Sequence, residues 1–393
     1  MADTVVPTFK RSFKYRIYPA KAQIKTLETQ LELCRELYNA ALEERREAWK
    51  KGASVNYYEQ SKQLPEIKKD RPEVAEIYGQ VLQQTLHRLD RAFKSFFRRV
   101  MSGGTPGHPR FRSKDRYDSM TWPQNTGFEL VGTKKLRLGK IGQVRIKLHR
   151  PLEGKPKTCT VKREAGKWYV FFSCDNVPGR AYPPATGEVG IDMGLTSYAT
   201  LSTGEKIENP RWYRQTEGRF IRDQHNLSRK KRGGKNHQKA KQKLARLGAK
   251  HANQRLNFQH KLAHRIVSDN DLIVAEDIDI KELVEKATTG LSKSITDAAW
   301  AQFLVILACK AGEAGRRFIK VLARGTSSTC SRCGAVRQKL LSERVHSCPC
   351  GLVLDRDINA ALNILRLGRS LRDSASSAPE KSRERSRHFC QNA

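Results

Sequence analysis

Cys330-Ser-Arg-Cys333 is followed, after 14 residues, by Cys348-Pro-Cys350-Gly-Leu-Val-Leu-Asp355-Arg-Asp357-Ile-Asn-Ala-Ala361. This segment joins two close pairs of cysteines to an acidic residue that opens a helical pattern. Two further carboxylates lie upstream at the ends of strand-like segments, in Val189-Gly-Ile-Asp192-Met-Gly194 and Leu272-Ile-Val-Ala-Glu276-Asp277. In a chain with a net charge of +35, three such acidic positions predict metal-dependent cutting of nucleic acid.

The cysteine pairs have the spacing of a zinc ribbon, in which two knuckles supply four thiolates in tetrahedral geometry. Four protein ligands leave no open position, so we expect one structural Zn²⁺ bound by Cys330, Cys333, Cys348 and Cys350. Gly334 and Gly351 follow the two pairs and suit the tight turns that such knuckles need. The second pair has one intervening residue rather than the usual two, and His346 is an alternative ligand in place of one thiolate.

The three acidic positions fit hydrolysis assisted by two Mg²⁺ ions held about 4 Å apart, because Mg²⁺ prefers carboxylate oxygens. Asp192 and Glu276 are the first two expected ligands, although Glu276 lies in a cluster of acidic residues within which spacing does not choose. At the third position Asp355 and Asp357 compete, since Asp355 is also placed to cap the helix that Asp357 opens. Each residue alone is typical of a cap or a surface group, so the prediction depends on the set.

The excess of basic residues, 75 Lys and Arg against 40 Asp and Glu, favours a polyanionic partner, because each neutralised phosphate releases counterions. Residues 229–250 hold ten Lys or Arg, and residues 224–268 hold no acidic residue. A solvated helix normally interleaves Glu with its basic residues. We therefore expect a helix pair here with one face on the core and the other on phosphates.

The sequence contains no run of about 18 apolar residues, so we predict no membrane partner. It has nine Cys and begins without the charged-then-apolar pattern of a secretion signal. Both features predict a reducing, cytoplasmic location, nucleoid-associated in action, rather than a disulfide framework.

Residues 9–17 alternate as a strand does, and residues 101–184 are rich in strands, so both segments are expected to form one β-barrel-like module. Residues 20–100 read as helices with basic faces inserted into it. Hairpin strands, a long helix, a strand, a helix, a strand and a final helix then follow, the order of an RNase H-like α/β fold. This multidomain α/β plus β-barrel chain is expected to end in a disordered tail, residues 371–393.

Four motifs resemble those of the TnpB family, proteins encoded by insertion sequences and similar to the ancestors of type V CRISPR effectors. They are Gly190-Ile-Asp192-Met-Gly194, Val274-Ala-Glu276-Asp277, the Cys-x₂-Cys pair and Asp355-Arg-Asp357-x-Asn-Ala-Ala-x-Asn-Ile. Further similarities lie at Arg16-Ile-Tyr-Pro19, Leu37-Tyr-Asn39, Pro109-Arg-Phe-Arg112 and Leu227-Ser-Arg-Lys-Lys-Arg232.

The resemblance implies an RNA-guided DNA endonuclease that uses a transposon-derived guide RNA and cuts double-stranded target DNA beside a short flanking motif. It implies a wedge β-barrel (1–19 and 101–184), a helical recognition domain (20–100), a RuvC-like nuclease domain (185–324 and 353–370) and a zinc-ribbon target-nucleic-acid-binding insertion (325–352).

By motif, Asp192 and Glu276 carry over as the first two RuvC acids. The third acid precedes x-Asn-Ala in the family, which selects Asp357. Tyr57 and Gln83 fall where the family places residues that read the flanking motif. The expected nucleic-acid contacts of the basic segment are Arg229, Lys230, Lys231 and Arg232.

Three other functions compete with this reading. A nuclease-silent RNA-guided repressor would have lost one of the acids, and all three are present. An accessory transposase-type protein could use the same acids to join DNA ends, but the His-x-His pair of single-strand transposases is missing from the sequence. A structural RNA-binding protein would make the acidic set a coincidence. The sequence predicts no oligomeric state.

Overall fold

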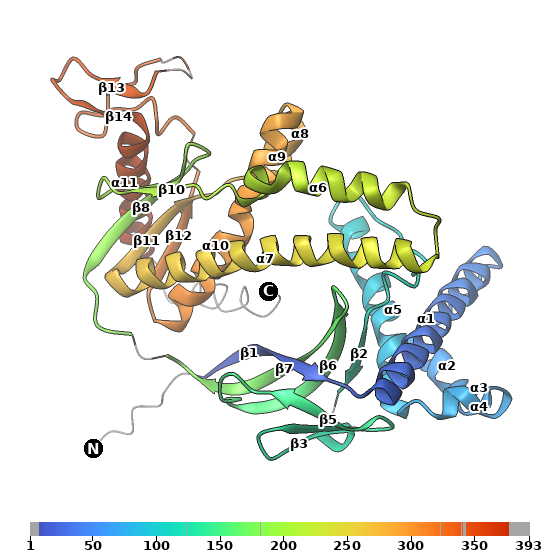
Figure 1. Cartoon of the computed structure of the whole chain (residues 1–393). Helices are drawn as coiled ribbons and strands as arrows, with labels where there is room; N and C mark the ends of the chain where they lie inside the picture. The colour runs from blue at the N-terminus through green and yellow to red at the C-terminus, as the bar shows by residue number, and fades with distance from the viewer. Residues whose placement is uncertain are drawn as a thin grey trace, which may run out of the picture. The chain divides into compact units, whose positions relative to one another are not determined.

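The computed structural model describes residues 8–123, 125–180, 182–322, 324–338, 340 and 343–376. The chain divides into two units, Met1–Pro178 and Gly179–Ala393, whose elements Figure 1 labels. Each unit has its own buried apolar core.

The first unit is built on a seven-stranded antiparallel sheet with the order β2-β6-β7-β1-β5-β4-β3. Along the central strand β1, Phe13, Tyr15 and Ile17 alternate with more exposed residues and enter the core, which confirms the strand predicted from this pattern. β1 pairs with β7 over almost its whole length, from Thr8 opposite Pro178 to Ile17 opposite Trp168. The strands are β1 Thr8–Tyr18, β2 Ser119–Trp122, β3 Phe128–Val131, β4 Lys135–Leu138, β5 Gly142–Lys147, β6 Lys155–Glu164 and β7 Lys167–Pro178.

Five helices separate β1 from β2, in the segment where helices were predicted. The two long helices pack together through apolar stripes that include Leu27 and Leu31 on the first and Leu82 and Leu86 on the second. The helices are α1 Lys21–Lys50, α2 Tyr57–Lys62, α3 Leu64–Asp70, α4 Pro72–Ala75 and α5 Gly79–Met101.

The second unit contains a five-stranded sheet with the order β10-β9-β8-β11-β12. β8, β9 and β10 form an antiparallel meander, whereas β8, β11 and β12 run parallel. Parallel neighbours end at the same edge of a sheet, so the last residues of β8 and β11 lie side by side. The strands are β8 Gly187–Met193, β9 Ser197–Leu201, β10 Lys206–Glu208, β11 Asn270–Glu276 and β12 Arg317–Val321.

The helices and strands of this unit follow the predicted order, except that two helices that were not predicted, α8 and α9, precede α10. A two-stranded hairpin with the second cysteine pair precedes the final helix. These elements are α6 Trp212–Ser228, α7 Lys235–Asp269, α8 Ile280–Lys286, α9 Thr289–Ala298, α10 Trp300–Glu313, β13 Val345–Ser347, β14 Val353–Asp355 and α11 Arg356–Ser376.

Glycine lets α11 approach the sheet closely. A Cβ atom at Gly190 on β8 would lie 2.1 Å from the carbonyl oxygen of Ala361, and one at Gly368 would lie 2.3 Å from a methyl group of Val274. Both distances are shorter than carbon contacts allow, so only glycine fits. The helix that carries Asp357 therefore lies directly on β8 and β11.

One expectation changes. The disordered tail was expected from residue 371, but α11 continues to Ser376, because Arg372 binds the carboxylate of Glu188 and extends the helix's contacts with the sheet. Residues 377–393 lie outside the described residues. One stretch, Thr289–Glu313, is long and apolar enough to cross a membrane by length and composition. It is broken at Ala299, where φ is 51°, and it buries Phe303 and Leu307, as core helices do.

Candidate functional site

The structure brings the first two predicted acids together at one edge of the second unit's sheet. Asp192 is the penultimate residue of β8, and Glu276 is the last residue of β11. Ala275 pairs with Ile191 in the parallel ladder, so the next residue on each strand is an acid. Asp357 joins them from the first turn of α11, which packs on β8.

The three carboxylates interact electrostatically. Burial, and after it the charges of Glu276 and Asp357, raise the pKa of Asp192 to about 8, whereas Arg356 opposes the shift. Burial also raises the pKa of Glu276. Carboxylates that perturb one another in this way are stabilised by a cation between them. Among the described residues, the group of possible metal ligands whose atoms all lie close together is the four cysteines. The oxygens of the three acids are not drawn together in this way.

The geometry distinguishes Asp355 from Asp357. Asp355 accepts hydrogen bonds from the backbone N–H groups of Asp357 (3.0 Å) and Ile358 (3.3 Å), as a helix cap does. Lys206 Nζ on β10 donates to the other oxygen of Asp355 at 2.6 Å. Burial by itself would raise the pKa of Asp355, but these three donors lower it. Asp355 is thus occupied as a cap, and its charge affects the pKa of Asp192 less than the charge of Asp357 does.

Without a bound cation, the protein should lose stability as Asp192 ionises. Its folded pKa of about 8 lies above the ordinary value of 3.8, so the folded state binds more protons between these values and stability falls as the pH rises. In EDTA, we expect the melting temperature between about pH 6 and pH 8 to fall more steeply for the wild type than for Asp192→Asn. Mg²⁺, which binds the ionised form, should remove the difference. Equal slopes in EDTA would contradict the raised pKa.

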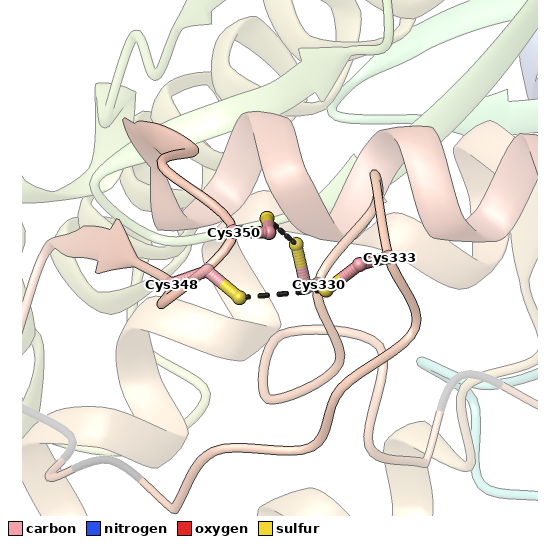
Figure 2. A group of neighbouring side chains, drawn as sticks. All are labelled: Cys330, Cys333, Cys348 and Cys350. Carbon is pink, nitrogen blue, oxygen red and sulfur yellow. Dashed lines mark hydrogen bonds between the residues drawn. The ribbon is translucent and has the colours of Figure 1, made fainter.

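The four predicted zinc ligands converge, as Figure 2 shows. Their sulfur atoms all lie within 4.8 Å of one another. Cys330 Sγ is 3.7 Å from Cys350 Sγ, and Cys333 Sγ is 3.5 Å from Cys348 Sγ. The one-residue spacing of the second pair therefore still delivers both thiols. His346, the alternative ligand, is fully buried beside Cys330 and hydrogen-bonds to it, so it supports the cluster from outside.

The donor set of this cluster suits a divalent metal ion. The backbone N–H of Cys333, followed by that of Arg332, stabilises the Cys330 thiolate and lowers its pKa to about 5. The N–H of Cys350 would lower the pKa of Cys348, but burial and the three neighbouring thiols raise it to about 12. Four thiols this close cannot all ionise without a cation, and Zn²⁺ provides the charge and tetrahedral geometry that they need.

The predicted basic segment forms an antiparallel helix pair, α6 and α7. Leu262 and Ile266 bury one face of α7 in the core. Asp223 on α6 is paired with Lys243 on α7 at 2.7 Å. The turn between the helices exposes Arg229, Lys230, Lys231 and Arg232. This turn presents positive charge to solvent without an acidic residue in its sequence.

Tyr57 and Gln83 lie in the first unit. The ring of Tyr57 stacks on His87, with centroids 3.7 Å apart and planes 16° from parallel. Gln83 is exposed on α5 one turn before His87. The two predicted residues thus flank one histidine, which the sequence analysis did not select.

Sequence reasoning also missed two buried asparagines of α11, Asn359 and Asn363. Both donate hydrogen bonds to the loop that leads into the first cysteine pair. Their spacing of four residues was the available signal, because two asparagines on one face of an apolar helix are unusual unless they are satisfied.

Family models match three parts of the chain. Residues 171–287 match "Probable transposase", residues 300–364 match "Cas12f1-like, TNB domain" and residues 9–54 match "Helix-turn-helix domain". The last description does not fit this structure, in which residues 9–54 contain β1 and the single 30-residue helix α1. The second match covers the whole cysteine cluster and Asp357.

Two relatives carry the name "Putative RNA-guided DNA endonuclease". One, from Streptomyces pristinaespiralis, is 38% identical over 91% of this chain and 89% of its own length. The other, InsQ from Escherichia coli (strain K12), is 29% identical over 92% of this chain and 93% of its own. Among solved structures, a chain of a Cas12f1–sgRNA–target DNA complex is similar in fold, with a TM-score of 0.55 and 15% identity over 91% of this chain and 98% of that one. The motifs and these relatives together place the chain in the TnpB family, the OrfB proteins of IS605-type insertion sequences.

Proposed function

We propose that this protein is an RNA-guided DNA endonuclease, as its relatives' names suggest. Asp192, Glu276 and Asp357 would hold the catalytic metal ions. The observation that carries the proposal is the meeting of these carboxylates at one sheet edge in a chain of net charge +35. The sheet order β10-β9-β8-β11-β12, with a meander followed by parallel strands, supports an RNase H-like RuvC domain. The seven-stranded sheet would be the wedge, and α1–α5 the recognition domain.

Two bound Mg²⁺ ions would activate a water molecule and stabilise the leaving oxygen of the phosphodiester. The chain's own groups prepare that chemistry. Gly190 lets α11 pack on β8, which holds Asp357 beside Asp192. Lys206 keeps Asp355 in its capping role. Arg356, whose Nε is 3.5 Å from Asp357, offsets part of the carboxylates' mutual repulsion.

The four thiolates would bind one structural Zn²⁺, which leaves no ligand position for a substrate. The segment that they fold would be the zinc-ribbon target-nucleic-acid-binding insertion. Its site is separate from that of the acids, although β14 runs directly into the helix that carries Asp357.

Guide RNA and target DNA are the proposed partners. Base pairing with the guide would supply sequence specificity, whereas the protein would hold the duplex by its backbone. The high positive charge supports this division, because backbone contacts need cations rather than specific side-chain geometry.

Changing Arg229, Lys230, Lys231 and Arg232 together to glutamine should weaken RNA binding and its dependence on salt. Each lost phosphate contact lowers the slope of log K against log salt by about 0.7 to 0.9, so four contacts lower it by about 3. Binding would be measured by filter retention at several salt concentrations.

The matched control changes Lys281, Lys286, Lys293 and Lys320 to glutamine. These lysines are ion-paired with carboxylates in the same unit. The control removes the same charge but should change the slope much less. Equal slopes for both variants would mean that net charge, rather than the α6–α7 turn, determines binding.

Tyr57→Ala and Gln83→Ala should relax or shift the preference for the flanking motif by about ten-fold, because each good base contact contributes about 1–3 kcal/mol of discrimination. Tyr58→Ala is the control, since Tyr58 is adjacent and 74% exposed. Preference would be measured on a plasmid library with a randomised flank. An unchanged preference in both variants would remove these residues from the proposed reading surface.

The function itself is tested by co-expressing the protein with its own locus and sequencing the RNA that copurifies. The complex is then incubated with Mg²⁺ and a library that carries a matched target beside a randomised flank. Double-strand cutting that depends on the flank would establish the proposal. Tight binding of RNA and target with no cutting would contradict it.

A further inference from the structure

Two asparagines on one face of α11 join the first cysteine pair to the helix that carries Asp357. Asn359 is fully buried and Asn363 is 2% exposed. They are one helical turn apart, so their amide groups point toward the same neighbour. That neighbour is residues 325–331, the cysteine loop, which includes Cys330 and precedes the second cysteine of the pair.

Asn359 binds the peptide groups on both sides of Cys330. Its Nδ2 donates to the carbonyl oxygen of Thr329 at 2.7 Å, and its Oδ1 accepts from the N–H of Ser331 at 2.9 Å. One side chain, that of Asn359, thus holds the backbone on both sides of Cys330, a proposed metal ligand. Because the Asn359 side chain is fully buried, breaking either bond would leave one of its polar atoms without this partner.

Asn363 reinforces this contact one turn further along the helix. Its Nδ2 donates to the same Thr329 carbonyl at 2.7 Å and to the carbonyl of Thr326 at 2.9 Å. The loop has little freedom of its own here, since the Thr329 N–H and hydroxyl both donate to the carbonyl of Gly325. The cysteine loop and the start of α11 therefore form one hydrogen-bonded body.

We propose that Asn359, reinforced by Asn363, is a positioning residue that couples the cysteine metal site to the acidic site. Asp357 lies two residues before Asn359, within the first turn of the same helix. Metal binding that orders the cysteine loop should therefore also order the first turn of α11. By thermodynamic linkage, ordering this turn must stabilise the metal-bound loop by the same free energy. The role assigned to Asp357 rests on the proposed nuclease function, but the coupling between loop and helix does not.

The test follows Zn²⁺ retention and amide hydrogen exchange in the full chain with its copurified RNA, since neither measurement requires cutting. Asn359→Ala should release Zn²⁺ to a colorimetric chelator at least about ten-fold faster than the wild type, the lower end of the range for groups that orient metal ligands. Removing Zn²⁺ from the wild type should speed exchange of amides 357–363. In Asn359→Ala these amides should already exchange fast, and removal of Zn²⁺ should add little.

Leu367→Ala is the control, because Leu367 is exposed on the same helix one turn beyond Asn363; it should behave as the wild type does. Asn359→Asp keeps the acceptor for Ser331 but sets an oxygen against Thr329, so it should resemble Asn359→Ala. If Asn359→Ala does not fold, Asn363→Ala, which keeps the contacts around Cys330, should show the same changes at smaller size.

Wild-type Zn²⁺ release in the asparagine variants would overturn the coupling. So would unchanged exchange of amides 357–363 after Zn²⁺ removal, or a wild-type chain that takes up no Zn²⁺. Coupling in a complex that cuts no DNA would instead leave this inference standing and contradict the proposed nuclease.

Discussion

Asp192→Asn should lower the rate of DNA cleavage by at least about a thousand-fold, because catalytic groups that act as a set lose most of their effect when one is removed. Asparagine keeps the size of the side chain but not the negative charge that Mg²⁺ requires. Loss of the charge also relieves repulsion with Glu276 and Asp357, so the fold should not suffer. The measurement is single-turnover cutting of a matched plasmid by the protein–RNA complex.

RNA binding must be measured in the same preparation, and it should be unchanged. Asp277→Asn provides the matched control for the second acid. Asp277 follows Glu276 directly, but it is half exposed and accepts from Lys320 Nζ at 3.1 Å. Glu276→Gln should be as inactive as Asp192→Asn, whereas Asp277→Asn should cut normally. Normal cutting by Asp192→Asn would remove the carboxylates from the mechanism.

Gly190→Ala should reduce both stability and activity. The new Cβ would lie 2.1 Å from the Ala361 carbonyl oxygen and 2.8 Å from the Leu365 nitrogen, and these backbone atoms cannot move without the helix. Displacement of α11 from β8 should lower the free energy of unfolding by about 2–3 kcal/mol, as overpacking of a core does. The same displacement carries Asp357 away from Asp192, so cleavage should fall more than RNA binding does.

Gly248→Ala is the control for this substitution. Gly248 lies within α7, and a Cβ there would meet nothing within 4 Å. Alanine should therefore stabilise the protein by about 0.5–1 kcal/mol through its higher helix propensity. Urea unfolding of the two variants compares the same chemical change at a crowded and an open position. If Gly190→Ala were as stable as the wild type, the close packing of α11 on β8 would be contradicted.

Local pattern was sufficient to predict the strands that carry the first two acids. An apolar, β-branched run such as residues 272–275 is typical of a buried strand, and an acid at its end lies at a sheet edge. The choice between Asp355 and Asp357 could not be made from spacing, because the side chain that occupies Asp355 is Lys206, which lies 149 residues earlier. Only the folded sheet brings that lysine to the start of α11.

The buried asparagines show a second kind of information that sequence periodicity lacks. Polar residues in a helix are normally assigned to its solvent face, so the four-residue spacing of Asn359 and Asn363 did not by itself reveal which groups they contact. The asparagines bind backbone carbonyl groups of a loop. The sequence does not show which carbonyl groups of a loop need a hydrogen-bond partner, because this depends on the folded structure. Gly190 is similar, because its importance comes from an approach between a strand and a helix that are far apart in sequence.

The pairing of Thr8 with Pro178 also affects the order in which the chain can fold during its synthesis on the ribosome. β1 is made well before its longest partner, because Pro178 at the end of β7 lies 170 positions after Thr8. The helices α1 to α5 consist of local contacts and can form while the rest is still being synthesised, whereas the sheet must wait for distant pairing. Until then the edge of β1 that will pair with β7 is unpaired, and the charges of Lys10, Lys14 and Arg16 along β1 disfavour association with other nascent chains.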